Sequence, residues 1–211
     1  MNISLVTPNL PEARSGNWVT AVRYRRILEG LGHRVRMSTG YNGEPADALI
    51  ALHARRSHPS VRDFAAAQPG KPSVVVLTGT DLYRDIRTDA DAQSSLDLAS
   101  RLVVLQRMGL PELPERHRAK TRVIYQSVTG CNGGGAHSSS ARFRVAVVGH
   151  LRAEKDPFRT ALAARLLPAD SRVQVLHAGS ALDSSFAQAA RAEEEVNPRY
   201  RWLEGIPHWR A

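Results

Sequence analysis

Short apolar runs without polar alternation recur along this chain and constrain its fold more than any other feature. The clearest is Ser73-Val-Val-Val-Leu77, and similar runs occupy residues 2–7, 47–52, 102–105 and 143–148. A strand that lacks a polar face is typical of a sheet buried on both sides. Because helical patterns separate these runs, the sequence predicts an α/β fold built on parallel sheets covered on both faces.

The remaining segments complete this alternation. Further strands are predicted over residues 33–37, 121–125, 172–177 and 200–203. Helices are predicted over residues 18–31, 61–67, 91–100, 157–167 and 186–195. Gly32 is expected to end the first helix, since glycine readily adopts the left-handed conformation that follows a helix.

A change in composition divides the chain. Residues 128–141 are rich in glycine and serine and hold almost nothing that could enter a core, so we predict a linker there. Two similar doubly wound, Rossmann-like domains are expected at residues 1–127 and 142–211. The second has only about 70 residues, roughly half of a usual doubly wound domain, and is expected to be incomplete.

The charge of the chain favours anionic partners. The formal net charge is +9, from 29 basic and 20 acidic residues. Phosphates and nucleotides suit this excess, but the arginines are dispersed and aromatic residues make up 6% of the chain, so nucleic acid is not expected as a partner.

Other features of the sequence bear on location. No apolar run approaches the roughly 20 residues of a membrane-spanning helix, and no secretory signal opens the chain. Cys131 is the only cysteine, which excludes an internal disulfide and a zinc site of several cysteines. We therefore expect a cytoplasmic protein. An exposed strand edge in the short second domain predicts poor solubility or self-association.

Three polar loops follow predicted strands of the first domain, where ligands of parallel sheets bind. The first holds Gly16 and Asn17, which either cap the next helix or contact a substrate. In the second, Arg55 and Arg56 follow His53 and are either solvated or able to clamp a phosphate.

The third loop is the most informative. It contains Thr78, Gly79, Thr80, Asp81 and Arg84 directly after the most apolar strand. A turn capped by the aspartate would explain part of this pattern. Hydroxyl, carboxylate and guanidinium groups together exceed what a turn requires, so the pattern favours a site.

A fourth loop opens the second domain. Gly149 and His150 follow the strand, and Arg152 and Lys155 precede a predicted helix. Two cations and a helix N-terminus could bind a diphosphate there, although surface loops also often contain such residues.

These loops carry a resemblance to a known family. The second-domain loop resembles the Gly-Arg-Leu…Glu-Lys-Gly motif of GT-B glycosyltransferases in the GT4-like group. Longer stretches resemble the selenosugar synthases of selenoneine biosynthesis: Asn17-Trp18, Ala51-Leu-His-Ala-Arg-Arg-Ser57, Leu77-Thr-Gly-Thr-Asp-Leu-Tyr-Arg-Asp-Ile86, Thr121-Arg-Val-Ile-Tyr-Gln-Ser127 and Val148-Gly-His-Leu-Arg-Ala-Glu-Lys-Asp-Pro157. Those enzymes join selenophosphate to the sugar of a UDP-sugar. The resemblance thus implies a GT-B fold of two Rossmann-like domains and a carbon–selenium bond-forming transfer.

The resemblance also implies roles for the loop residues. Thr80 and Asp81 are expected in catalysis. The acceptor is expected to contact Gly16, Asn17, His53, Arg55, Arg56, Thr78, Gly79 and Arg84. The donor diphosphate is expected to contact Gly149, His150, Arg152 and Lys155. UDP-sugar is a co-substrate, and no metal or other cofactor is implied, because GT-B enzymes generally work without one.

The sequence departs from the family at several points. Thr80 stands where many members have a histidine, His150 where arginine is common, and Asp156 where glycine is usual. The family's Glu-x7-Glu element has no match, which predicts a truncated product. Glu193, Glu194 and Glu195 are expected to form a solvated face. Two alternatives stay open: an ordinary GT4-like enzyme with a hydroxyl acceptor, and an inactive remnant that binds nucleotide or phosphate.

Overall fold

The computed structural model describes residues 1–9, 15–127 and 142–206. Within it the chain divides into two compact units, Met1–Gly130 and Cys131–Ala211. The predicted linker, residues 128–141, lies outside the described residues. Each unit is a parallel α/β structure, which confirms the expected fold class.

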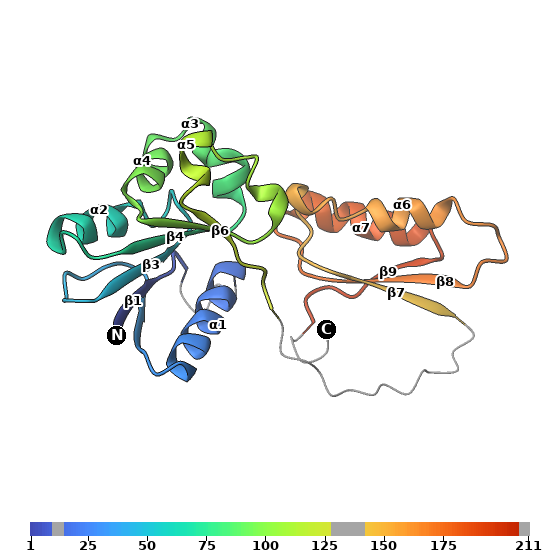
Figure 1. Cartoon of the computed structure of the whole chain (residues 1–211). Coiled ribbons are helices and arrows are strands. Elements are labelled where there is room, and N and C mark those ends of the chain that lie inside the picture. The colour runs from blue at the N-terminus through green and yellow to red at the C-terminus, as the bar shows by residue number, and fades with distance from the viewer. Residues whose placement is uncertain (10–14, 128–141, 207–211) are drawn as a thin grey trace. The chain divides into compact units, whose positions relative to one another are not determined.

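The first unit is built on a six-stranded parallel sheet (Figure 1). Its strand order is β2-β1-β3-β4-β5-β6. The strands are β1 (Asn2–Val6), β2 (Arg34–Ser38), β3 (Ala48–Leu52), β4 (Ser73–Leu77), β5 (Arg101–Val104) and β6 (Thr121–Val123). The order reverses at β1, which pairs with β2 on one side and with β3 on the other. The carboxyl ends of β1, β3 and β4 therefore lie next to one another.

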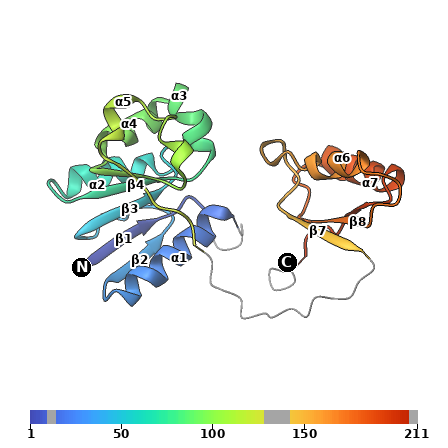
Figure 2. The ribbon, with the colours of Figure 1, turned by 45° about the vertical axis from the view of Figure 1, so that its right-hand side comes forward.

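Both faces of this sheet are covered, as the apolar runs predicted. Along β4, Val75 and Leu77 pack into one buried cluster and Val76 packs into another. Figure 2 shows α1 (Gly16–Gly30) on one face and α2 (His58–Ala67) and α4 (Ala90–Leu98) on the opposite face. Phe64 of α2 is fully buried, and burying such a side chain contributes about 1.5–3 kcal/mol.

Local signals place most element ends. Gly32 has a φ of 84° and its N–H donates to the Glu29 carbonyl, which confirms its predicted place after the first helix. The helix α2 begins at His58, earlier than predicted, because Pro59 is accommodated in its first turn. Residues 81–85, read from sequence as a loop or turn, form a short π-helix. The other α-helices of the first unit are α3 (Ile86–Thr88) and α5 (Glu115–Arg118).

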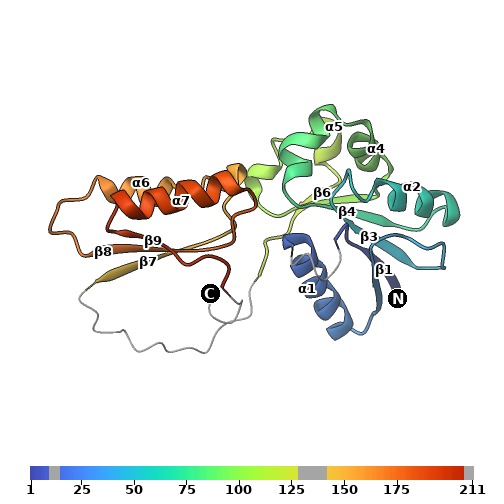
Figure 3. The same cartoon turned by 180° about the vertical axis from the view of Figure 1, so that it is seen from behind.

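The second unit has a three-stranded parallel sheet in the order β7-β8-β9. Its strands are β7 (Phe143–Val148), β8 (Val173–Ala178) and β9 (Tyr200–Trp202). The helices α6 (Arg159–Arg165) and α7 (Ser184–Val196) lie on the same side of the strands (Figure 3). Among the described residues no helix covers the opposite face of this sheet, in line with the expectation that the second domain is incomplete. Phe143 and Val148 of β7 are each 67% exposed.

The glutamates of α7 also differ from expectation. Glu193 is buried, pairs with Arg165 of α6 and accepts a hydrogen bond from Asn197. Glu194 accepts a hydrogen bond from the Trp202 backbone N–H at 2.8 Å. The prediction of a solvated glutamate face is therefore wrong for these two residues, because α7 turns them toward its neighbours in the unit.

Candidate functional site

The candidate site of the first unit lies where β3 and β4 end. His53 directly follows β3, and Thr78 directly follows β4. Since these strands are adjacent and parallel, the sheet brings the two polar loops to one edge. This edge adjoins the reversal of strand order at β1, the position where open α/β sheets bind ligands.

Asp81 connects the two loops. Its Oδ1 accepts hydrogen bonds from the backbone N–H groups of Thr78 at 3.0 Å and Gly79 at 2.9 Å. Its Oδ2 accepts one from the backbone N–H of Ala54 at 2.9 Å. The side chain is fully buried. Asp81 is thus placed to fix both loops, and its catalytic role, expected from the sequence, stays a prediction.

The loop after β3 is held at further points. The hydroxyl of Ser95, from α4, donates to the Ala54 carbonyl at 2.7 Å, and the hydroxyl of Ser57 donates to the Leu52 carbonyl at 2.6 Å. His53, between these anchors, has a φ of 73°. A left-handed conformation costs a non-glycine residue free energy and persists where its surroundings enforce it. Such strain is common at binding sites.

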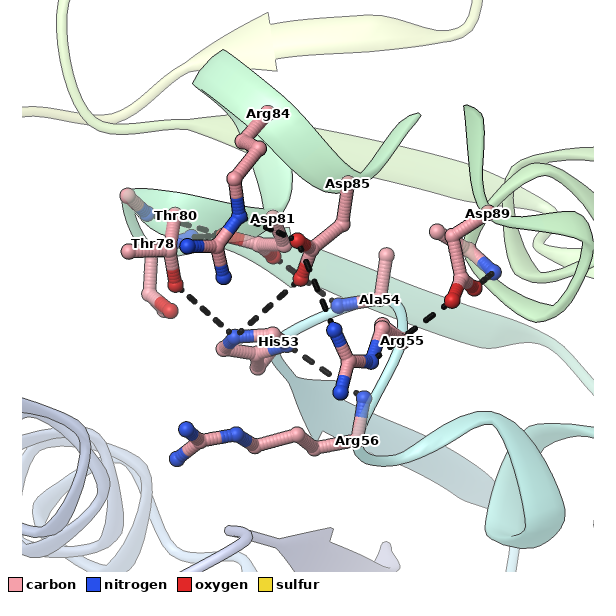
Figure 4. A network of polar contacts seen from close by, with 12 residues as sticks. His53, Ala54, Arg55, Arg56, Thr78, Thr80, Asp81, Arg84, Asp85 and Asp89 are labelled. Carbon is pink, nitrogen blue, oxygen red and sulfur yellow. Dashed lines mark hydrogen bonds and ion pairs between the residues drawn. The ribbon is translucent and has the colours of Figure 1, made fainter. Parts of the chain in front are cut away.

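His53 is buried at the centre of the cluster (Figure 4). Its Nδ1 accepts the backbone N–H of Arg56 at 3.3 Å, so a neutral ring carries its proton on Nε2. That Nε2 lies 3.2 Å from Thr80 Oγ1 and 4.0 Å from Asp85 Oδ2. The Nε2–H therefore donates to the Thr80 hydroxyl oxygen, which leaves the Thr80 proton free to donate elsewhere.

Burial lowers the pKa of the His53 imidazole below its ordinary value. The Asp81 carboxylate opposes this shift most strongly, and Asp85 opposes it less. The guanidinium groups of Arg56 and Arg55 add to the lowering. His53 is therefore neutral near pH 7 and acts there as a hydrogen-bond donor rather than as a cation.

Charges in this cluster are sorted by depth. Asp85 is 4% exposed, and its Oδ1 pairs with Arg84 Nε at 2.9 Å and with Arg55 Nη1 at 3.7 Å. Figure 4 shows these two guanidinium groups beside the buried carboxylate, with Arg55 also reaching Asp89. The side chains of Arg84 and Arg55 are 64% and 46% exposed. Cations thus face solvent and carboxylates face the protein.

Arg56 differs from the other two arginines. Its side chain is exposed and extends away from the carboxylates in Figure 4. Among the described residues it has no ion pair or side-chain hydrogen bond. Its guanidinium therefore keeps its full capacity to bind an anion.

The predicted loop before α1 is only partly described. Ser15 caps the helix, its Oγ accepting the Trp18 backbone N–H at 3.2 Å. The alternative that Asn17 is the cap is wrong, because it lies inside the first turn. Gly16 is exposed at the helix start. Their predicted contacts with an acceptor remain predictions.

The candidate site of the second unit follows β7. Gly149 is part of the loop, His150 is exposed, and Lys155 is an exposed residue of a 3-10 turn, Ala153–Lys155. Arg152 is half-buried, with its Nε 4.0 Å from Glu154 Oε2. The helix α6 begins at Arg159, later than predicted, so Lys155 lies a full turn before it. Asp156 has a φ of 44°, which explains why glycine is usual at this position of the motif.

Several residues that hold these loops in place could not be identified from the sequence. Ser95 and Ala54 are 41 residues apart, and Gln126, whose Nε2 donates to Thr20 Oγ1 at 3.0 Å, is 106 residues from its partner. Single serines and glutamines are common on any surface. Such long-range contacts emerge only when the strands are placed side by side.

Two cavities lie at the opposite, amino edge of the sheets. One of about 350 Å³ is lined by Arg172, Val173 and Arg199 near the starts of β8 and β9. Another of about 540 Å³ is lined by Asn2, Ile3 and Arg34 near the starts of β1 and β2. Ligands of open parallel sheets bind at the carboxyl edge, so we do not assign the candidate site to these cavities.

Residues 1–9, 15–127 and 142–206 hold neither a metal-binding cluster nor a membrane-spanning helix. They contain no group of three or more His, Cys, Asp or Glu side chains arranged to hold a metal ion. None of their helices has the length and apolar character needed to cross a membrane.

Similar folds occur among solved structures. Anabaena HepE, in a crystal structure with UDP and glucose, is 15% identical with a TM-score of 0.60, and the match covers 98% of this chain and 70% of HepE. The HepE complex with UDP-glucose gives a TM-score of 0.55 at 15% identity, covering 98% of this chain and 70% of HepE. Acinetobacter baumannii MurG is 10% identical with a TM-score of 0.54, covering 99% of this chain and 68% of MurG.

These identities support a shared fold and nothing finer. No protein-family model and no curated protein matches the sequence. Parallel sheets in two units, together with these neighbours, fit the Rossmann-like GT-B fold and confirm the fold that the motifs led us to expect.

Proposed function

We propose that the chain is a glycosyltransferase that transfers a sugar from a UDP-sugar to selenophosphate. The fold supports the donor part of the proposal, since HepE, which shares it, was crystallised with UDP and with UDP-glucose. The sequence motifs support the acceptor. The observation that carries the proposal is the layer of solvent-facing arginines over buried carboxylates at the ends of β3 and β4.

This layer suits a small phosphate-like acceptor. Arg56 is available to bind it, and Arg55 and Arg84 are held near the same place by Asp85. A planar guanidinium matches two phosphate oxygens, so such a cluster favours an anion over a neutral sugar alcohol. The buried Asp85 fixes Arg55 and Arg84 without meeting the acceptor.

The second-unit loop is assigned to the donor. Arg152 and Lys155 would stabilise the negative charge that the diphosphate gains as it leaves. In the transfer, the bond between the sugar C1 and the diphosphate oxygen breaks, and its electron pair departs with UDP. Selenium supplies the electron pair for the new C1–Se bond.

Selenophosphate is a soft and already anionic nucleophile, so no side chain has to remove a hydroxyl proton. This agrees with a neutral His53 whose Nε2–H is directed at Thr80 and Asp85. The Thr80 hydroxyl is then free to donate a hydrogen bond to the acceptor or to the sugar. Thr80 is therefore assigned to positioning the reactants.

The test is an assay of UDP release by the purified chain. UDP-glucose and UDP-N-acetylglucosamine are each offered with selenophosphate, inorganic phosphate or a panel of alcohols. We expect UDP release with selenophosphate and a product whose mass spectrum carries the isotope pattern of selenium. Turnover with the alcohols alone would replace the proposal by an ordinary hydroxyl-acceptor enzyme.

Binding measurements separate the remaining alternative. Calorimetry of the chain with UDP-sugar is expected to show binding in addition to turnover. Binding without release of UDP under any acceptor would identify a remnant that retains the nucleotide site and has lost the reaction.

A further inference from the structure

A buried histidine near the carboxyl end of β8 connects the loop after β7 to the first residue of β9. His177 of β8 is 1% exposed. Its Nε2 lies 3.2 Å from the Gly149 carbonyl oxygen, in the loop after β7. Its Nδ1 lies 3.0 Å from the Tyr200 hydroxyl, on β9. Both ring nitrogens therefore have a partner, which offsets the cost of burying the ring.

The direction of each hydrogen bond follows from the chemistry of the partners. A carbonyl oxygen only accepts, so Nε2 carries the proton and donates to Gly149. Burial lowers the pKa of His177, which keeps the ring neutral and leaves Nδ1 as an acceptor. Burial also raises the pKa of Tyr200, with smaller contributions from Glu194 and Glu193, so its hydroxyl stays protonated and donates to Nδ1.

The backbone of the loop after β8 packs against the peptide that follows Gly149. Gly179, after β8, has a φ of 157°, and a Cβ added there would lie 1.9 Å from the Gly149 carbonyl oxygen. The Gly149 N–H donates to the Ala178 carbonyl at 2.9 Å. The Leu151 N–H donates to the Ser180 carbonyl at 3.0 Å. The loop after β7 is thus fixed to the end of β8 on both sides of His150.

The peptide between Gly149 and His150 is the part that remains available. A trans peptide is planar, with its C=O and N–H pointing in opposite directions. Because the Gly149 carbonyl points to the buried His177, the His150 N–H points away from it. Among the described residues this N–H makes no hydrogen bond, and His150 is exposed.

From this geometry we infer that His177, with Tyr200 as its hydrogen-bond donor, is a positioning residue that orients the His150 backbone N–H toward the donor diphosphate. The inference rests on the proposed function, which assigns this loop to the diphosphate. A purely space-filling role would not require a polar ring. An apolar side chain of similar size would fill the same volume without a desolvation cost.

The test uses the full chain and the variants His177→Phe, His177→Gln and Tyr200→Phe. Phenylalanine at 177 removes both hydrogen bonds, whereas glutamine retains an N–H that can reach the Gly149 carbonyl. Asn197→Ala serves as a matched control. Asn197 is 2% exposed and its side chain donates to the Ala161 carbonyl at 3.0 Å, but it precedes β9 at the amino edge of the sheet.

Two readouts are measured. Loss of one hydrogen bond to a charged group is expected to weaken binding of UDP and of inorganic pyrophosphate by about tenfold in His177→Phe. KM for UDP-sugar should rise by about the same factor, with KM for selenophosphate unchanged. Hydrogen exchange of the loop peptide around residues 149–151 should accelerate in His177→Phe and Tyr200→Phe, and return toward wild type in His177→Gln.

The outcomes separate this inference from the proposed function. If the wild-type chain binds neither UDP nor pyrophosphate, the proposed function fails, while the exchange measurement still tests the hydrogen bonds to the loop. Faster exchange in His177→Phe that is confined to this loop supports the positioning role. Unchanged exchange and affinity in His177→Phe, or equal acceleration throughout the unit in that variant and in Asn197→Ala, would overturn it.

Discussion

At the scale of single residues, the cluster at the ends of β3 and β4 separates support from recognition. Asp81 and Asp85 are buried; Asp81 binds backbone N–H groups and Asp85 binds guanidinium groups. Arg56 is exposed and makes no such supporting contact. Substitutions should therefore fall into two groups, one that changes stability and one that changes binding.

Arg56→Ala belongs to the binding group. Removing an exposed guanidinium that contacts a charged acceptor is expected to raise KM for selenophosphate about tenfold. The urea midpoint should not move, because the side chain makes no contact that the fold needs. Steady-state kinetics check this, with Arg62→Ala of α2 as control, since Arg62 is exposed and pairs with Asp63. An equal KM in both variants would contradict the role given to Arg56.

Asp81→Asn belongs to the stability group. An amide has one oxygen to offer where the carboxylate accepts three backbone N–H groups, and its own N–H₂ faces a donor. We expect a loss of about 1.5–3 kcal/mol in the free energy of unfolding, the range for hydrogen bonds to charged groups. Urea denaturation measures it. Asp63→Asn, at an exposed ion pair, should change stability by less than about 1 kcal/mol.

His53 gives a pH dependence whose sign is fixed. Its pKa is lowered in the folded chain, so below the ordinary value near 6.5 the unfolded chain binds more protons. The contribution of His53 to stability is therefore complete above about pH 6.5 and declines as the pH falls through that value. Titration of the ring protons by NMR should give a midpoint below 6.5, and Arg56→Ala should move it upward. A midpoint at or above 6.5 would contradict the burial of a neutral ring.

At the scale of elements, much of the structure was predictable from the sequence. Every predicted strand is present, because runs such as Ser73–Leu77 admit few alternatives to a buried strand. The sequence also predicted that polar loops follow β3, β4 and β7. The π-helix at Asp81–Asp85 was not predictable, since its residues have no periodicity that distinguishes it from a turn.

The same limit applies to individual contacts. Glu193 carries the pattern of a charged helical face, and only the packing of α7 against α6 turns it inward toward Arg165. Ser95 looks like any helical serine until α4 lies beside the loop after β3. The hydrophobic pattern of a helix or strand predicts which face is buried, but it does not predict which polar side chain bonds to a neighbouring element.

Gly179→Ala tests the close approach of two loops. The added methyl would overlap the Gly149 backbone, and the residue would have to hold a φ of 157°. We expect the second unit to lose about 1–3 kcal/mol of stability, the usual cost of overpacking. Gly149→Ala is the matched control, because a Cβ there has nothing within 4 Å. Urea denaturation followed by the NMR signal of the Trp202 indole compares them, and equal stability of the two variants would contradict the packing described.

At the scale of the whole molecule, the two units differ in how much core they possess. Among the described residues, the first has buried clusters on both faces of six strands, whereas the second has one cluster, under α6 and α7. A core this small, in fewer than about 70 residues, rarely supplies more than 3–5 kcal/mol.

We therefore expect unequal behaviour of the isolated units. Residues 1–127 alone should unfold cooperatively in urea, with a slope of roughly 1–3 kcal/mol per molar. Residues 142–206 alone should bind a hydrophobic dye and unfold without a sharp transition. Circular dichroism and dye fluorescence on both fragments check this, and a sharp transition of the smaller fragment would contradict it.

The attachment of Asp81 to the backbone of two separate loops has a consequence for redesign. Neither loop can be replaced alone. A new loop after β3 would lose its hydrogen bond to Asp81, and a new loop after β4 would remove Asp81 itself, which holds the backbone next to His53. To change the acceptor preference by exchanging loops, residues 53–57, residues 78–85 and Ser95 would have to be replaced together.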